Sequence, residues 1–132
     1  MLYEYGLTIP ANTSKSAPVS AEVPVSPGRL VRVLILFPLG HRGYTHAWIQ
    51  RGEHRLFPSD PEETFVGDGH IIDWPEDYVL DDIPYTFKVY GYNDDDSYQH
   101  TIYFHFAIIP LVAVGARAAA GGWLAKLKEA LT

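Results

Sequence analysis

Histidine is the residue type in this chain with the widest chemistry, because imidazole binds metals and transfers protons near neutral pH. The six histidines are His41, His46, His54, His70, His100 and His105. They form neither a His-x-His pair nor the His-x-x-x-His spacing that places two ligands on one helix face. A jelly-roll metalloenzyme would show a His-x-His pair followed by a Glu and a later His. The spacing therefore predicts no transition-metal site.

An acidic run, Asn93-Asp94-Asp95-Asp96, is the second candidate for chemistry. Carboxylate and amide oxygens bind hard cations such as calcium, but the run lacks the alternating spacing and the distal Glu of an EF-hand loop. Asp and Asn are also favoured in turns, because their side chains cap nearby backbone groups. We interpret the run as a turn and leave calcium binding open.

Nucleophilic catalysis has no recognisable motif in the sequence. No serine lies in a Gly-x-Ser-x-Gly context, and no glycine-rich loop opens a helix. The chain has no cysteine, which excludes thiolate catalysis, disulfides and cysteine zinc sites. The sixteen Asp and Glu residues offer many carboxylate pairs of the glycosidase kind, but nothing singles out two of them. We therefore predict a protein without enzymatic activity and without a cofactor.

The composition is that of one folded domain. The 132 residues are 47% hydrophobic and 14% aromatic, which is enough for a core without metals or disulfides. The net charge is −6 and the ten Lys and Arg residues do not cluster, so we expect no nucleic-acid partner. The longest apolar stretch, 104–114, is too short to span a membrane, and residues 1–5 alternate like a strand rather than a secretion signal. We expect an intracellularly made domain with no membrane partner.

Alternating apolar residues predict strands through most of the chain. Residues 3–9 and 19–26 each have one apolar face, and Pro24 marks the second segment as an edge strand because it lacks an N–H. Residues 30–37 are apolar on both faces apart from Arg32, which implies cover on both sides. That cover must come from the C-terminal segment or from a neighbouring subunit.

A glycine turn predicts a short hairpin in the middle of the chain. Gly52-Glu53 fits a two-residue type II′ turn, which would place Ile49 opposite Leu56 and Trp48 opposite Phe57. Further along, residues 70–74 read as a strand and residues 75–84 as a loop.

Residues 85–106 predict a longer hairpin, with the acidic run as its four-residue turn at 94–97. Matching the two apolar rows gives the pairs Val89–Ile102, Phe87–Phe104 and Tyr85–Phe106, since a one-residue slip would bring Lys88 into the core. The opposite face would carry a mixed polar and aromatic row: Lys88, Tyr90, Tyr92, Tyr103 and His105.

About eight strands with short turns predict an all-β protein, an antiparallel β-sandwich that is jelly-roll-like, over residues 1–109. Residues 110–132 read as a linker and a short amphipathic helix, with Trp123 and Leu127 on its apolar stripe. A free helix of this length is marginal in water, so it must dock on its own sheet or on a partner.

A small cysteine-free domain with an extended N-terminal segment, a two-faced strand and a separate C-terminal tail resembles the decoration (cement) proteins on the outside of tailed-phage heads. The resemblance is architectural, over roughly residues 1–109, with Phe37-Pro38-Leu39-Gly40 and Gly91-Tyr92-Asn93-Asp94-Asp95 as its local features. It implies a structural viral protein on the virion surface, assembled in the host cytoplasm. It also implies a homo-oligomer, often a trimer, that binds the major capsid protein or another large assembly.

Two functions follow as hypotheses. In the first, the protein makes subunit and partner contacts through Leu34, Leu36, Lys88, Tyr90, Tyr92, Tyr103, His105, Trp123 and Leu127. In the alternative, a carbohydrate-binding module stacks sugars on aromatic side chains drawn from Tyr44, Trp48, Trp74, Tyr90, Tyr92 and Tyr103.

Overall fold

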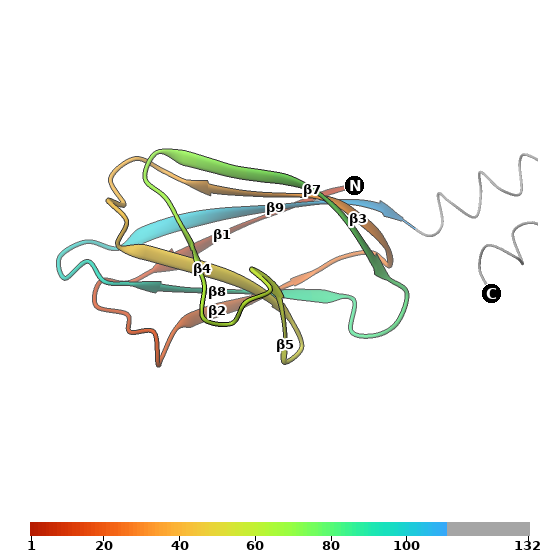
Figure 1. The fold of residues 1–132 in the computed structure, drawn as a ribbon, viewed down its shortest axis with the longest axis horizontal. Coiled ribbons are helices and arrows are strands. Elements are labelled where there is room, and N and C mark those ends of the chain that lie inside the picture. Colours follow the sequence, from red (N-terminus) through yellow and green to blue (C-terminus); the bar gives the residue numbers. More distant parts are fainter. Residues whose placement is uncertain (111–132) are drawn as a thin grey trace, which may run out of the picture.

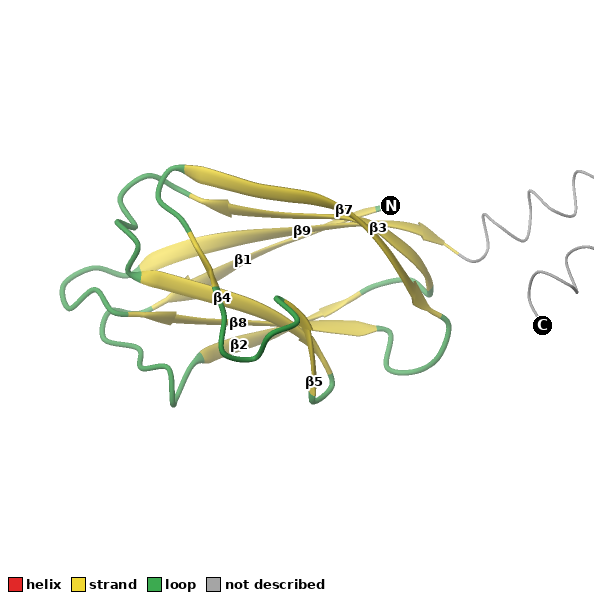
Figure 2. Ribbon diagram, in the orientation of Figure 1, coloured by secondary structure: helices red, strands yellow, loops and turns green. Residues whose placement is uncertain are grey.

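The computed structural model describes residues 1–110, which form two antiparallel β-sheets packed face to face (Figures 1 and 2). The predicted C-terminal helix, with Trp123 and Leu127, lies outside the described residues. Sheet A has the strand order β1 (Leu2–Ile9), β9 (His100–Pro110), β3 (Gly28–Phe37) and β7 (His70–Leu80). Sheet B has the order β2 (Val19–Pro24), β8 (Thr86–Asn93), β4 (Thr45–Arg51) and β5 (His54–Phe57), and β6 (Phe65–Val66) also pairs with β4.

The strand pairs are nested along the chain. β4 pairs with β5, β3 with β7, β2 with β8 and β1 with β9, so the chain is one long hairpin rolled into two layers. The Gly52-Glu53 turn is the tip of that hairpin, and Gly52 has the positive φ of +60° that such a tight turn needs. Nested pairing of this kind is the jelly-roll arrangement, so the predicted β-sandwich class is confirmed.

The core lies between the layers, where the inward side chains of both sheets interdigitate. Phe87 of sheet B stacks on Phe106 of sheet A with ring centroids 4.7 Å apart. Ile9 of sheet A packs against the backbone of Gly91 in sheet B, where a Cβ would lie only 2.4 Å from the Ile9 Cδ1 atom. Glycine at position 91 therefore allows the two sheets to approach closely.

The predicted hairpin over residues 85–106 is wrong. β8 pairs with β2 and β4, whereas β9 pairs with β1 and β3, so residues 94–99 cross from one sheet to the other. The two apolar rows still face each other, but across the core rather than along a ladder. Apolar alternation is satisfied equally by both arrangements, which is why it did not distinguish them.

Two smaller predictions about register also need correction. The turn at 52–53 is present, but a bulge between Ile49 and Gln50 places Ile49 opposite Phe57 rather than Leu56. The strand predicted over 70–74 continues to Leu80 through Pro75. Proline is tolerated there because β7 is an edge strand of sheet A.

The expectation that Pro24 marks an edge strand is confirmed, and β3 carries apolar side chains on both faces as its sequence indicated. The cover expected for its outer side does not come from residues 1–110. Pro24 ends β2, which is an edge strand of sheet B. In β3 the side chains of Val33 and Ile35 are fully buried in the core, whereas Leu34 and Leu36 point outward and are half-buried. The outer side of sheet A is therefore apolar at its centre.

Candidate interaction surfaces

The outer side of sheet A carries a contiguous group of apolar side chains that is here called the apolar face. Its members are Leu2, Leu34, Leu36, Ile71, Tyr103 and Ala107. Leu36 lies between Tyr103 and Ile71 across the ladder, and Leu2 lies beside Ala107. Leu34, two residues before Leu36 on β3, connects the two groups. Leu2 is 67% exposed and Ile71 is 53% exposed, and the others are half-buried. Large side chains exposed next to one another are typical of a surface that contacts another element.

Polar groups cross the apolar face at Leu34, which lies between His105 and Asp73 on the neighbouring strands. Arg32 donates two hydrogen bonds to Asp73, at 2.8 and 2.6 Å, and this ion pair lowers the pKa of the Asp73 carboxyl. Glu4 and His105 are cross-strand neighbours on the β1 side, and Glu4 makes no ion pair within residues 1–110. A shallow depression of about 110 Å³ lies between Leu2, Arg32, Leu34, His105 and Ala107.

Glycine and tyrosine flatten the centre of this surface. The ring of Tyr103 covers Gly6 on the neighbouring strand, and a Cβ at Gly6 would lie 3.1 Å from that ring. The ring therefore lies down on β1 rather than standing away from the sheet. The apolar face is consequently broad and flat, a shape that suits a helix or another sheet better than a small molecule.

The outer side of sheet B carries the second group of predicted interface residues, here called the aromatic face. It consists of His46, Trp48, Arg55, Lys88, Tyr90 and Tyr92. The rings of Trp48 and Tyr90 stack with centroids 5.2 Å apart, and those of His46 and Tyr92 with centroids 4.3 Å apart. Two cations contact these rings: Lys88 lies over Tyr90 and Arg55 lies over Trp48, as in cation–π interactions.

The chain itself covers much of the aromatic face. Arg55 lies 4.9 Å from the Trp48 ring centroid and donates hydrogen bonds to the carbonyls of Pro61 and Glu63. The Thr64 hydroxyl contacts His46 Nδ1 at 2.8 Å. Trp48 is only 8% exposed as a result, although it points away from the core. Burial also lowers the pKa of Arg55 and of His46.

The predicted interface residues are thus divided between opposite sides of the molecule. Leu34, Leu36, Tyr103 and His105 lie on the outer side of sheet A, whereas Lys88, Tyr90 and Tyr92 lie on the outer side of sheet B. The single outward row expected along one hairpin does not exist, because β8 and β9 belong to different sheets.

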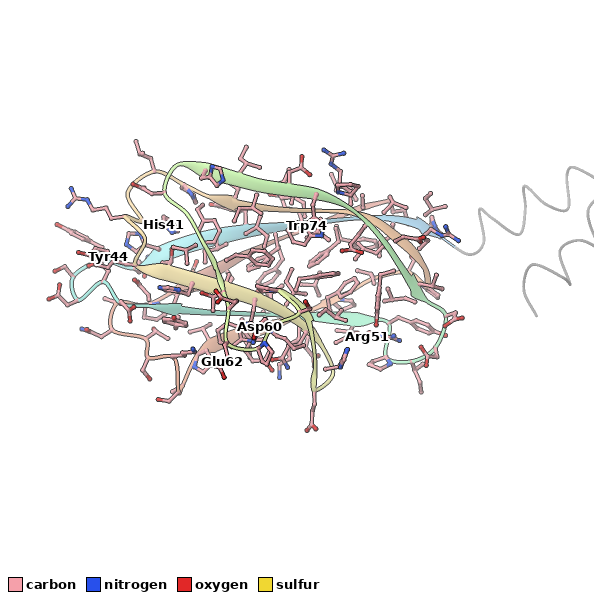
Figure 3. All side chains as sticks on the ribbon, viewed as in Figure 1. His41, Tyr44, Arg51, Asp60, Glu62 and Trp74 are labelled. Carbon is pink, nitrogen blue, oxygen red and sulfur yellow. The ribbon has the colours of Figure 1, made fainter. Side chains whose placement is uncertain are left out.

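The aromatic residues predicted to stack sugars are not gathered either. Trp74 points into the space between the layers, where it packs against Phe57 and Phe65 (Figure 3). Tyr44 lies in the loop at the opposite end of the sandwich from the Gly52-Glu53 turn, close to His41 in sequence, and is 42% exposed. A cleft of about 580 Å³ does lie beside the aromatic face, lined by Glu22, Gln50, Gly52, Glu53, Pro84, Thr86, Lys88 and Tyr90.

A buried polar cluster closes one end of the sandwich, and sequence reasoning missed it. His100 Nε2 lies 2.9 Å from the Asp95 carboxylate, and its ring lies against that of His41, with centroids 4.5 Å apart. His41 Nδ1 contacts the hydroxyl of Thr45, which is fully buried. Burial and the neighbouring His100 lower the pKa of His41. Because the Thr45 hydroxyl contacts no solvent, the cluster holds loops together rather than presenting a nucleophile.

The acidic run belongs to this cluster and behaves as a turn. The Asp95 carboxylate accepts hydrogen bonds from the backbone N–H groups of Ser97 and Tyr98, and its hydrogen bond with His100 lowers its pKa. The Asn93 amide donates to the carbonyls of Tyr98, Ile9 and Pro10, the last two at the end of β1. Residues 1–110 contain no group of three or more His, Asp or Glu side chains placed to hold a metal ion.

Within the described part of the chain, the structure has no helix that is long and apolar enough to cross a membrane. Known protein-family models do not match the chain, and neither does any curated protein sequence.

Proposed function

We propose that this is a non-enzymatic structural protein that self-associates and binds the surface of a larger assembly. The observation that supports it is the apolar face, where Leu2 and Ile71 are more than half exposed beside half-buried leucines. Burying apolar surface contributes about 25 cal/mol per Å², so a broad flat face of this kind is a favourable place for another protein to bind.

The jelly-roll arrangement adds a weaker argument. Viral capsid domains, lectins and cupins all use this arrangement, so the arrangement alone does not select a function. The combination of a jelly-roll arrangement with an apolar outer face on sheet A favours a viral capsid domain. A capsid decoration protein that assembles as a trimer on the major capsid protein is the specific form that we propose.

Light scattering on the full chain across the micromolar range tests self-association. We expect an oligomer that Leu36→Glu converts to a monomer, because a carboxylate at the centre of the apolar face cannot be buried without a partner. Thr86→Glu, at a half-buried position on the outer side of sheet B, is the matched control and should leave the oligomer intact. A wild-type protein that stays monomeric throughout the range would contradict the proposal.

Carbohydrate binding is the second candidate, and the cleft beside the aromatic face favours it. The cleft offers one half-exposed aromatic ring, Tyr90, among carboxylate, amide, hydroxyl and ammonium groups. Its volume is within the range of small-ligand sites. A glycan array tests this function: a hit lost on Tyr90→Ala but retained on Leu36→Glu would favour it over assembly.

A further inference from the structure

The apolar face has no cover within residues 1–110, and the chain continues from the sheet that bears it. β9 is a central strand of sheet A and ends at Pro110. A further 22 residues, 111–132, follow that strand. These residues therefore start after Pro110, which lies three residues beyond Ala107 on β9, past the end of the apolar face that carries Leu2 and Ala107.

The sequence of this segment complements the apolar face. Leu124, Leu127 and Leu131 recur at the spacing of one helical stripe, which needs an apolar surface to stabilise it. The segment is basic, with Arg117, Lys126 and Lys128 against Glu129. The whole chain has a net charge of −6, so residues 1–110 are more acidic still, and Glu4 places a carboxylate at the β1 edge of the apolar face.

The length of the linker indicates whether the segment packs on the apolar face of its own molecule or on that of a neighbouring molecule. A flexible linker over 111–122 has a root-mean-square span of about 20 Å. The centre of the apolar face at Tyr103 is seven residues back along β9, or about 23 Å. When the linker matches the span, the effective concentration of a tethered segment reaches the millimolar range, far above a micromolar protein concentration.

We propose that residues 123–131 pack on the apolar face of the same molecule and cover Leu34, Leu36 and Tyr103. The proposal rests on the proposed function in one respect, because it makes the segment a competitor for the surface used in self-association. A second copy would have to displace the segment before it could bind, so the segment sets the concentration at which assembly begins.

Paramagnetic relaxation enhancement on the full chain tests the proposal. Because the chain has no cysteine, Ala125→Cys provides a single site for a nitroxide label on the polar side of the stripe. We expect loss of amide signal intensity at Leu36, Tyr103 and His105, with little loss at Ser20 and Glu22 on the outer side of sheet B. Uniform intensities over both sheets would overturn the proposal.

A mixed sample separates the two origins of such a contact. Nitroxide-labelled chain at natural isotope abundance is combined with unlabelled, nitrogen-15-enriched chain. Attenuation at Leu36 in this mixture would mean that the segment comes from a neighbouring molecule, which would also overturn the proposal. We expect attenuation only when the label and the isotope are in the same chain.

Variants of residues 123–131 test whether docking of the segment limits self-association. They also distinguish the docking proposal from the proposed function. Leu124→Asp with Leu127→Asp should abolish the attenuation and shift the onset of self-association to lower concentration, whereas Lys126→Asp, on the polar side of the stripe, should do neither. Attenuation in a chain that never self-associates would refute the proposed function and leave the docking intact. A monomeric sample, below the concentration at which self-association begins, that shows no attenuation at Leu36 would refute the docking alone.

Discussion

The two outer faces of the sandwich differ in how their large side chains are covered. On sheet B, Trp48 points away from the core and is nevertheless 8% exposed, because Arg55 and the chain after β5 lie over it. On sheet A, Ile71 occupies an equally outward position and is 53% exposed. An outward position on a strand therefore does not make a residue available for binding. The loops that cross the sheet decide which face another molecule can reach.

Of the substitutions considered, replacing the covered Trp48 should lower the free energy of unfolding most. Trp48→Ala removes the ring that stacks on Tyr90 and supports Arg55, and we expect a loss of about 3–5 kcal/mol in the free energy of unfolding. Urea denaturation followed by far-ultraviolet circular dichroism measures it. Leu36→Ala on the apolar face should cost only about 1 kcal/mol. Equal losses at the two positions would show that the apolar face is covered as fully as the aromatic face, as it would be if residues 123–131 packed tightly on it.

Removing the cation that covers Trp48 should have the next largest effect. Arg55→Met keeps the length of the side chain but loses its hydrogen bonds to the carbonyls of Pro61 and Glu63, at an expected cost of about 1–3 kcal/mol. Amide hydrogen exchange in residues 58–64 should accelerate. Arg29→Met, which breaks an exposed ion pair with Asp77, is the control and should leave exchange unchanged.

The buried end of the sandwich, where loops from both sheets meet, should respond to pH. His41 has a lowered pKa in the folded state, so the folded protein binds fewer protons than the unfolded chain. The contribution of His41 to the free energy of unfolding is complete above the unfolded pKa of about 6.5. It is lost as the pH falls below that value, and the free energy of unfolding changes by up to about 1.4 kcal/mol per pH unit. The groups facing it are His100 and the carboxylate of Asp68.

Urea midpoints measured between pH 7.5 and 5 check this expectation. His41→Gln should reduce the slope, and the exposed His54→Gln should leave it unchanged. A residual slope from His46 is expected, because burial lowers its pKa as well. An unchanged slope in His41→Gln would locate the pH dependence elsewhere.

The smallest effect is expected for the ion pair that borders the apolar face. Asp73→Asn removes one charge of a solvent-exposed pair with Arg32, and such pairs contribute little to stability. We expect an unfolding midpoint within experimental error of the wild type. A clear loss would mean that the border of the apolar face is rigid and partly desolvated, like the aromatic face.

The sandwich class and its edges followed from the sequence because they depend on local chemistry. Pro24 lacks the N–H of an interior strand, and Gly52 supplies the positive φ of a two-residue turn. Both features depend on a few neighbouring residues, so they can be predicted without knowing which strands pair. The two-faced pattern around Leu34 also indicated correctly that the outer side of sheet A is apolar.

The candidate surfaces could not be predicted, because they depend on which strands pair. Phe87 and Phe104 point into one core whether β8 and β9 form a hairpin or lie in opposite layers, so alternation leaves the choice open. A jelly roll requires the second arrangement, and that requirement conflicts with the predicted hairpin. The His41–His100 contact was equally hidden, since it joins a loop residue to the first residue of β9, 59 residues apart in sequence, which only the nested pairing brings together.

The nested pairing also fixes an order of events during synthesis. β4 and β5 can pair as soon as a two-residue turn has left the ribosome, but β1 must wait for β9, and the Met1 amino group bonds to a carbonyl 107 residues away. At about 5–20 residues per second, β1 spends roughly 5–20 seconds without its partner. Throughout that interval its backbone is an unpaired strand, which other chains or chaperones can bind. Among the described strands, β1 is thus made first and protected last.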